Sequence, residues 1–193
     1  MRQKDDKKEQ QIFDATLELV VKTGLAGVTM CDISKAAGIA TGTLYIYFKN
    51  KEDLINELFT LCRKQSAAFY FNNLKDEEPF EESFQKVFYN IVQYRLHNFK
   101  KSVLLEQYYH SPYVSEKNRQ LSASQLQPFY KLMERGKKEK LVKDCDSLLI
   151  LWFVVGCINE VMKGCYYKKR QVADSEIADL YTMCWDGIRN PRP

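Results

Sequence analysis

The 193-residue sequence contains little histidine, proline and glycine, and its cysteines follow no metal-binding pattern. Two histidines, His97 and His110, are too few for a catalytic or zinc-binding cluster, and the six scattered cysteines include no Cys-x-x-Cys pair. No glycine-rich loop follows a predicted strand, which argues against a phosphate-binding loop. We therefore expect no metal, no cofactor and no enzymatic activity, and we expect the cysteines to be reduced thiols.

Long apolar runs and a strong charge of one sign are also missing. The longest apolar run, residues 148–158, is too short to span a bilayer, and the charged first residues lack the apolar core of a secretory signal. These features predict a cytoplasmic protein with no membrane partner. The net charge of +4 permits nucleic-acid binding without requiring it. With 45% hydrophobic and 28% charged residues, the chain can bury a core.

Apolar residues recur at helical spacing along the chain, which predicts an all-α fold. The first helix is expected to end at Gly24, and its buried face comprises Ile12, Phe13, Leu17, Val20 and Val21. Residues 72–79 are polar and contain a proline, so they predict a loop, and residues 97–101 predict a polar break before a short helix over 103–110. Pro128 is expected to kink or restart a helix between residues 115 and 140.

Residues 29–51 predict two short helices, a tight turn and the start of a third helix. Thr29 is placed to cap the first helix, with Asp32 three residues later in a capping-box arrangement. Gly38 can adopt the left-handed conformation that ends this helix. The second helix is expected over residues 41–48, with Leu44 and Phe48 four apart on its inner face. Helix, turn and helix in this order are typical of the helix-turn-helix motif, whose second helix enters the major groove of DNA.

Hydroxyl-bearing side chains occupy the outward positions of this motif, and such groups suit phosphate and base-edge contacts. Lys51 lies in the first turn of the next helix, where a cation opposes the helix dipole. A DNA phosphate at the same helix end would explain that lysine, and the alternative is a solvated surface lysine. We predict phosphate contacts from Thr29, Tyr45, Tyr47 and Lys51, base contacts from Thr41 and Thr43, and close approach at Gly42.

Residues 38–54, GIATGTLYIYFKNKEDL, closely resemble the DNA-binding segment of TetR-family transcriptional regulators. Two positions depart from the family pattern: Ala40 stands where serine is frequent, and Tyr47 stands where histidine is frequent. Ala40 provides no side-chain cap for the second helix, a role that Thr41 is a candidate to fill.

The resemblance implies an N-terminal three-helix helix-turn-helix domain over residues 1–50. At its start, the residues themselves predict either a basic arm that contacts phosphate or a solvated first helical turn, formed by Arg2, Lys4, Lys7 and Lys8. It implies a helical effector-binding and dimerisation domain over residues 51–193. The implied function is that of a ligand-responsive repressor. Such a protein binds a palindromic operator in double-stranded DNA as a homodimer and is released by a small apolar or amphipathic effector.

The last two helices are apolar enough to need more cover than one chain provides, which favours a two-fold dimer interface over packing within the chain alone. The predicted interface residues are Leu149, Phe153, Gly156, Ile177, Tyr181 and Trp185. An effector pocket between the helices of the body is expected to be lined by Phe69, Phe84, Phe88, Tyr108, Phe129, Met133 and Trp152, although each is also a candidate for ordinary core packing.

Two alternatives stay open from the sequence. One is an effector-independent DNA-binding protein whose body only dimerises or contacts another protein. The other is an enzyme carrying a helix-turn-helix domain, which would need a polar cluster deep in a pocket.

Overall fold

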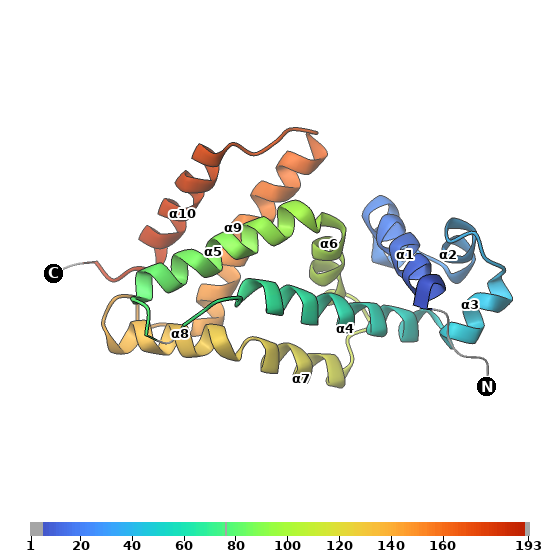
Figure 1. The fold of residues 1–193 in the computed structure, drawn as a ribbon, viewed down its shortest axis with the longest axis horizontal. Helices are drawn as coiled ribbons and strands as arrows, with labels where there is room; N and C mark the ends of the chain where they lie inside the picture. Colours follow the sequence, from blue (N-terminus) through green and yellow to red (C-terminus); the bar gives the residue numbers. More distant parts are fainter. Residues whose placement is uncertain (1–5, 76, 192–193) are drawn as a thin grey trace. The chain divides into compact units, whose positions relative to one another are not determined.

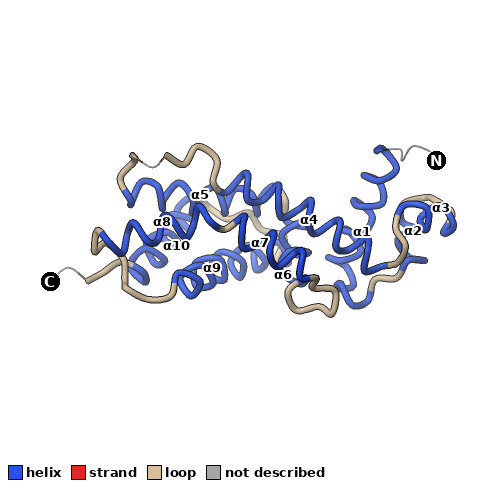
Figure 2. The backbone as a smooth tube through the Cα atoms, turned by 90° about the horizontal axis from the view of Figure 1, so that it is seen from below, coloured by secondary structure: helices blue, strands red, loops and turns tan. Residues whose placement is uncertain are grey.

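The computed structural model describes residues 6–75 and 77–191, which form ten α-helices with no strand among them (Figures 1 and 2). The predicted all-α fold is confirmed. Arg2 and Lys4 of the predicted basic arm lie outside the described residues. The helices are α1 Asp6–Gly27, α2 Met30–Ala36, α3 Thr41–Tyr47, α4 Lys51–Tyr70, α5 Phe80–His97, α6 Phe99–Tyr108, α7 Glu116–Gln125, α8 Gln127–Lys138, α9 Ser147–Tyr167 and α10 Asp174–Ile188.

The chain divides into two compact units, each with its own hydrophobic core. Unit 1 comprises Met1–Gln65 and Asn98–Ser124, and unit 2 comprises Ser66–His97 and Gln125–Pro193. These units group residues by spatial contact. The predicted functional boundary between residues 50 and 51 stays a prediction.

In unit 1, α1 packs against α2 and α6, and α2 packs against α3. The α1 helix is interrupted at Gly24, whose φ of 74° and ψ of 156° are not helical, so the predicted end of the helix falls at the right residue. A short turn continues to Gly27. The N–H of Leu25 donates to Gln107 Oε1 at 2.6 Å, which fixes this turn to α6.

In unit 2, α5 packs against α8, α9 and α10, and its aromatic residues form the centre of the core. The Phe80 and Phe84 rings lie nearly parallel with centroids 6.3 Å apart, and Trp185 of α10 packs against both. A Cβ on Gly136 of α8 would lie only 2.4 Å from the Phe80 ring. The absence of a side chain at this position therefore allows α8 to pack closely against α5.

The helix boundaries confirm two sequence predictions and correct a third. The α4 helix ends at Tyr70 and α5 begins at Phe80, which confirms the loop over 72–79, and α8 restarts beside Pro128. The predicted break over 97–101 is wrong in extent, because Asn98 alone separates α5 from α6. Asn98 is non-helical, with φ −130° and ψ 42°, whereas the charged residues after it occupy the first turn of α6.

The predicted absence of a membrane-length apolar segment also needs correction. The α9 helix has 21 residues and is long and apolar enough to cross a membrane by length and composition alone. The uninterrupted apolar run ends at Ile158, whereas the helix continues through Glu160 and Lys163, which form an ion pair at 2.6 Å. The core helix of a soluble protein meets the same criteria, and Ile150, Val154 and Ile158 of α9 are buried in the core of unit 2.

All six cysteines are free thiols, as predicted. Cys62 and Cys184 are buried, and burial raises the pKa of each thiol to about 12. Both thiols therefore stay protonated near neutral pH, and protonated thiols are poor nucleophiles.

Candidate nucleic-acid interface

The α2 helix begins with the cap that the sequence predicts. Thr29 is extended, with φ −119° and ψ 159°, and its Oγ1 accepts the N–H of Asp32 at 3.2 Å. The second half of the arrangement differs from a capping box, because the Asp32 carboxylate accepts the Thr29 hydroxyl at 2.6 Å. The hydroxyl predicted to contact a phosphate therefore already donates within its own turn.

The turn between α2 and α3 also forms as predicted. Gly38 has a φ of 65°, a conformation that residues with a Cβ rarely adopt. The N–H of Ile39 then returns to the Ser34 carbonyl at 3.0 Å, and the Ile39 side chain packs against the core of unit 1. A glycine and an apolar residue thus set the direction in which α3 leaves the turn.

The α3 helix has one buried face and one exposed face. Leu44 and Phe48 are fully buried, and Phe48 packs against Phe13 of α1 with ring centroids 5.6 Å apart. On the exposed face, Tyr45 is 52% and Ile46 is 65% exposed. Ile46 was not among the predicted site residues, because an isoleucine in a helical sequence more often indicates core.

The predicted base-reading residues of α3 have different surroundings. Ala40 precedes the helix without a side-chain cap, and Thr41 does not substitute for one. Instead, Thr41 Oγ1 and the buried Ser34 Oγ share a hydrogen bond of 2.9 Å, which holds α3 against α2. Thr43 is half-buried. A Cβ added to Gly42 would meet open space, because no heavy atom of the described residues lies within 4 Å of it apart from the adjacent residues and the backbone of α3.

Lys51 is not placed as a free phosphate anchor. Its Nζ donates to the carbonyl oxygens of Leu25 at 2.9 Å and Ala26 at 3.2 Å, and it lies 5.1 Å from the centroid of the Tyr113 ring. The ammonium group therefore binds the carbonyls in the turn after Gly24. The sequence around Lys51 does not reveal this role, because the two acceptor carbonyls lie 26 and 25 residues earlier in the chain.

Lys49, which was not among the predicted site residues, is an exposed cation beside α3. Its side chain is exposed in the segment directly after α3, and its backbone N–H donates to Asp53 Oδ2 at 2.9 Å. The Asn50 side chain in turn accepts the N–H of Asp53 at 2.8 Å and so caps α4. These two hydrogen bonds fix the backbone that carries Lys49.

The residues predicted to line an effector pocket do not form one site. Phe69 and Trp152 are 43% and 64% exposed, so they lie at the surface. Four of the predicted residues are at most 1% exposed and fill the core of unit 2: Phe84, Phe88, Phe129 and Met133.

Tyr108 belongs to unit 1 and does not share a site with these aromatics. Its ring stacks on Phe59 with centroids 3.8 Å apart, and its hydroxyl donates to Asn56 Oδ1 at 2.7 Å. The buried Asn118 side chain donates to the same hydroxyl at 3.0 Å. Tyr108 is therefore part of a buried hydrogen-bond network that joins α4, α6 and α7.

The predicted dimer residues divide between surface and core. Leu149 and Phe153 are 56% and 42% exposed on one face of α9, and Gly156 and Trp152 share that face by helical spacing. Met183 adds a 70% exposed side chain on α10.

Three predicted interface residues of α10 mainly pack within the chain. Ile177 is only 4% exposed, so the prediction that its side chain lies at a dimer interface is wrong. Tyr181 and Trp185 are half-buried against α5, with Tyr181 5.3 Å from Phe88 between ring centroids. Burial, followed by the charge of Glu81, raises the pKa of Tyr181 to about 12.

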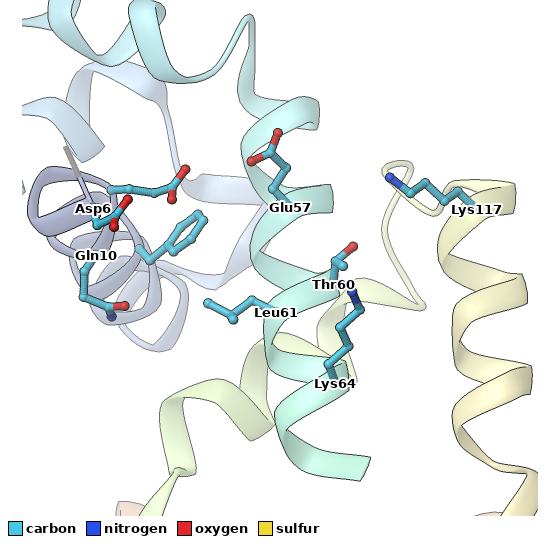
Figure 3. Close-up of a pocket in the computed structure, with 9 residues that line it drawn as sticks. Asp6, Gln10, Glu57, Thr60, Leu61, Lys64 and Lys117 are labelled. Carbon is cyan, nitrogen blue, oxygen red and sulfur yellow. The ribbon is translucent and has the colours of Figure 1, made fainter. Parts of the chain in front are cut away.

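Unit 1 also contains an open pocket of about 500 Å³ (Figure 3). Its walls carry carboxylates and lysines together, so the lining favours no single ligand charge. No group of three His, Cys, Asp or Glu residues that could hold a metal was found in the part of the chain that the structure describes. The pocket is lined by Asp6, Glu9, Gln10, Phe13, Glu57, Thr60, Leu61, Lys64 and Lys117.

Comparison with known proteins agrees with this helix-turn-helix architecture. Residues 12–58 match the model of the bacterial regulatory proteins of the tetR family, and residues 79–189 match the tetracyclin repressor-like C-terminal domain. The second match alone covers more than half of the chain. The protein therefore belongs to the TetR family of transcriptional regulators.

An HTH-type transcriptional regulator from Haemophilus influenzae is 33% identical over 91 residues, which are 47% of this chain and 49% of that protein. The chain thus matches about half the length of that curated relative. The crystal structure of a TetR family transcription regulator from Marinobacter aquaeolei has the same fold, with a TM-score of 0.86 and 23% identity, and the match covers 99% of this chain and 100% of that one.

A second similar structure is the transcriptional regulator FadR from Bacillus subtilis in complex with stearoyl-CoA. Its TM-score is 0.65 at 20% identity, and the match covers 92% of this chain and 95% of that one. The matched family is one of transcriptional regulators, which confirms the predicted class of protein.

Proposed function

We propose that this protein is a cytoplasmic repressor that binds a palindromic operator as a homodimer and is released by a small effector. In this proposal α3 enters the major groove, and unit 2 provides both the dimer interface and the effector site. No membrane takes part.

The observation that carries the proposal is the division of α3 into two faces. Leu44 and Phe48 anchor the helix in the core, so the opposite face is held rigidly outward. Tyr45 and Ile46 project from that face, and Ile46 offers an apolar contact of the kind that reads a thymine methyl group. A helix held in this way can lie in a groove without losing its own packing.

The proposal assigns the DNA contacts according to these surroundings. Thr43 is the candidate base reader, Tyr45 and Tyr47 offer phosphate contacts, and Lys49 supplies the nearby positive charge. Gly42 allows the backbone to come close to the DNA. Thr29, Thr41 and Lys51 act by holding α2, α3 and the end of α1 in position.

The exposed apolar face of α9 supports the homodimer. Leu149, Trp152 and Phe153 would cost about 1–2 kcal/mol each to leave in water when a partner surface is available. A second copy of the chain provides the same face, and a two-fold axis pairs a face with itself. Two copies of α3 related by that axis read a palindrome.

A small amphipathic effector is supported by the fold shared with the FadR protein that holds stearoyl-CoA. Effector binding would favour a dimer whose two α3 helices no longer match successive major grooves. DNA and effector would then weaken each other's binding by the same factor.

Selection of bound duplexes from a random pool by the purified protein tests the DNA-binding part. The expected result is a palindromic motif, with the centres of its half-sites one or two helical turns apart. Enrichment of no sequence, or of one asymmetric half-site, would refute the palindromic homodimer. Thr43→Val should change the enriched motif, because it removes the hydroxyl while keeping the shape.

Gly42→Ala tests whether the backbone approaches DNA at Gly42, because it should change the affinity for DNA without lowering the stability of the protein. The added methyl group meets open space within the protein, and alanine favours the helix, so the stability should stay equal or rise by up to about 1 kcal/mol. Affinity for the selected duplex should nevertheless fall at least tenfold. Undiminished affinity would show that the backbone does not approach DNA at Gly42.

Sedimentation equilibrium tests the dimer. Trp152→Ser should shift the protein toward monomer at micromolar concentration, whereas Tyr45→Ser, which removes a similarly exposed aromatic ring from unit 1, should leave the dimer intact. A monomeric parent protein, or equal effects of the two changes, would contradict an interface on α9.

A further inference from the structure

Unit 2 contains a groove of about 400 Å³ that no sequence prediction included. This volume lies within the range of roughly 300–1,000 Å³ that small-molecule sites occupy. One wall comes from the chain after α4 and the other from the first turns of α8. The groove is lined by Phe71, Leu74, Lys75, Gln127, Pro128, Lys131, Leu132 and Arg135.

The inner surface of the groove is apolar and continuous with the core of unit 2. Leu132 is 4% exposed, and Phe71 and Leu74 are half-buried against the same core cluster. An alkyl chain lying here would therefore bury its methylene groups on existing apolar surface. Three of the aromatics predicted for the effector pocket, Phe84, Phe88 and Phe129, belong to this cluster, so a ligand in the groove would contact the edge of the core they form.

The polar lining of the groove is positively charged. Lys75 and Lys131 are exposed at its rim, Arg135 contributes a guanidinium group, and no carboxylate is found among the described lining residues. Arg135 Nη2 donates to Ser83 Oγ at 3.0 Å, which holds the guanidinium group in place.

The carboxylate of Glu78, between α4 and α5, is already used elsewhere, because Lys86 donates to both of its oxygens at 2.7 and 2.8 Å. It therefore does not neutralise the charge of the groove. Two exposed lysines, and an arginine whose guanidinium group already donates to Ser83, lie beside an apolar wall and match a ligand with an anionic head group and an alkyl chain.

We propose that this groove binds a single-chain amphiphile with an anionic head group, with the chain against Phe71, Leu74 and Leu132 and the head group between Lys75, Lys131 and Arg135. The proposal names the chemical class of the effector, and its link to DNA release rests on the function proposed above. Binding to the protein itself does not depend on that function.

Isothermal titration of the full chain in the absence of DNA tests the binding. The probes are palmitate, palmitoyl-CoA, 1-hexadecanol and free coenzyme A, each below its aggregation concentration. Palmitate or palmitoyl-CoA should bind saturably with one site per chain, and at least tenfold more tightly than both the neutral alcohol and the chainless head group. Palmitoyl-CoA binding alone would assign a polyanionic head group, and palmitate binding would assign a carboxylate.

Chain length and charge give two independent checks. Shortening the chain from palmitate to myristate removes two methylene groups and should weaken binding on the order of tenfold. Lys75→Ala combined with Lys131→Ala should weaken binding of the anionic probe at least tenfold and leave hexadecanol binding unchanged. Lys138→Ala, which removes an exposed lysine of α8 that does not line the groove, is the matched control and should change neither.

Equal affinity for hexadecanol and the anions, insensitivity to the paired lysine change, or no saturable binding would each overturn the proposal. Because both lysines are exposed, the double variant should keep the parent's urea midpoint, which separates lost binding from lost folding. A failed operator selection would refute the proposed repressor but leave this binding result standing. Operator binding without amphiphile binding would refute only the groove.

Discussion

Lys51→Met tests whether Lys51 holds the end of α1 or contacts DNA. Methionine keeps most of the apolar stem and removes the ammonium group. That group donates to the Leu25 and Ala26 carbonyls at 2.9 and 3.2 Å and lies over the Tyr113 ring. The substitution therefore removes two charge-assisted hydrogen bonds and one cation–π contact.

The magnitude follows from the exposure of these groups. Leu25 is 3% exposed, so losing the hydrogen bond to its carbonyl should cost about 1–2 kcal/mol. Ala26 is exposed, and water can replace the lysine at its carbonyl at little cost. The cation–π contact adds about 0.5 kcal/mol at a partly exposed site. We expect Lys51→Met to lower the free energy of unfolding by about 2 kcal/mol.

Urea unfolding followed by circular dichroism measures this change, provided that the slope of unfolding free energy with urea stays constant. Lys49→Met is the matched control. The Lys49 side chain is exposed and its backbone N–H makes the hydrogen bond to Asp53, so the control should change stability by less than about 0.5 kcal/mol. Equal losses from the two substitutions would refute the assignment of Lys51 to the end of α1.

The salt dependence of DNA binding should change for Lys49→Met and not for Lys51→Met, the reverse of the effects on stability. A lysine that neutralises one phosphate contributes about one unit to the slope of log affinity against log salt concentration. We expect Lys49→Met to reduce that slope by about one and Lys51→Met to leave it unchanged, because the Lys51 ammonium group donates inward. A reduced slope for Lys51→Met would restore it as a phosphate contact.

Two further predictions concern unit 2. Gly136→Ala places a methyl group 2.4 Å from the buried Phe80 ring and should destabilise the protein by about 1–3 kcal/mol in the same urea assay. The control Gly164→Ala adds a methyl group that meets open space in a helix, so it should be neutral or stabilising. Similar effects of the two substitutions would show that the Phe80 ring moves freely. Hydrogen bonding from Arg170 lowers the pKa of Glu176 from 4.5 to about 2, so its stabilising contribution is present above pH 4.5 and is lost as the pH falls toward 2. Glu176→Gln should therefore flatten the fall in melting temperature over that range, and an unchanged acid limb would contradict the role of this pair.

Local sequence features predicted the helix-turn-helix motif well. The Thr29 cap, the left-handed Gly38 and the inward pair Leu44 and Phe48 each depend on residues within one or two helical turns. Interactions of this range act in almost any surrounding fold, so a single sequence reveals them. The Asn98 break shows the limit, because one non-helical residue sufficed where a polar stretch predicted several.

The predicted pocket failed as a group for a different reason. Helical spacing shows that Phe84, Tyr108 and Trp152 each belong to an apolar stripe, but it does not show which stripes meet. Phe84 lies in the core of unit 2, Tyr108 lies in the core of unit 1, and Trp152 lies at the surface of α9. The groove along α8 was missed because its two walls, one after α4 and one along α8, are distant from each other in the sequence.

The sequence by itself determined the all-α fold, the capped turn that presents α3 and the family of the protein, because these depend on short-range spacing. Only the tertiary structure decided that Lys51 binds the carbonyls after Gly24 and that Thr41 holds α3 against Ser34. Donor and acceptor in these pairs lie 26 and seven residues apart, and their approach depends on how the helices pack. Spacing along one helix carries no information about contacts that the folded chain makes between helices.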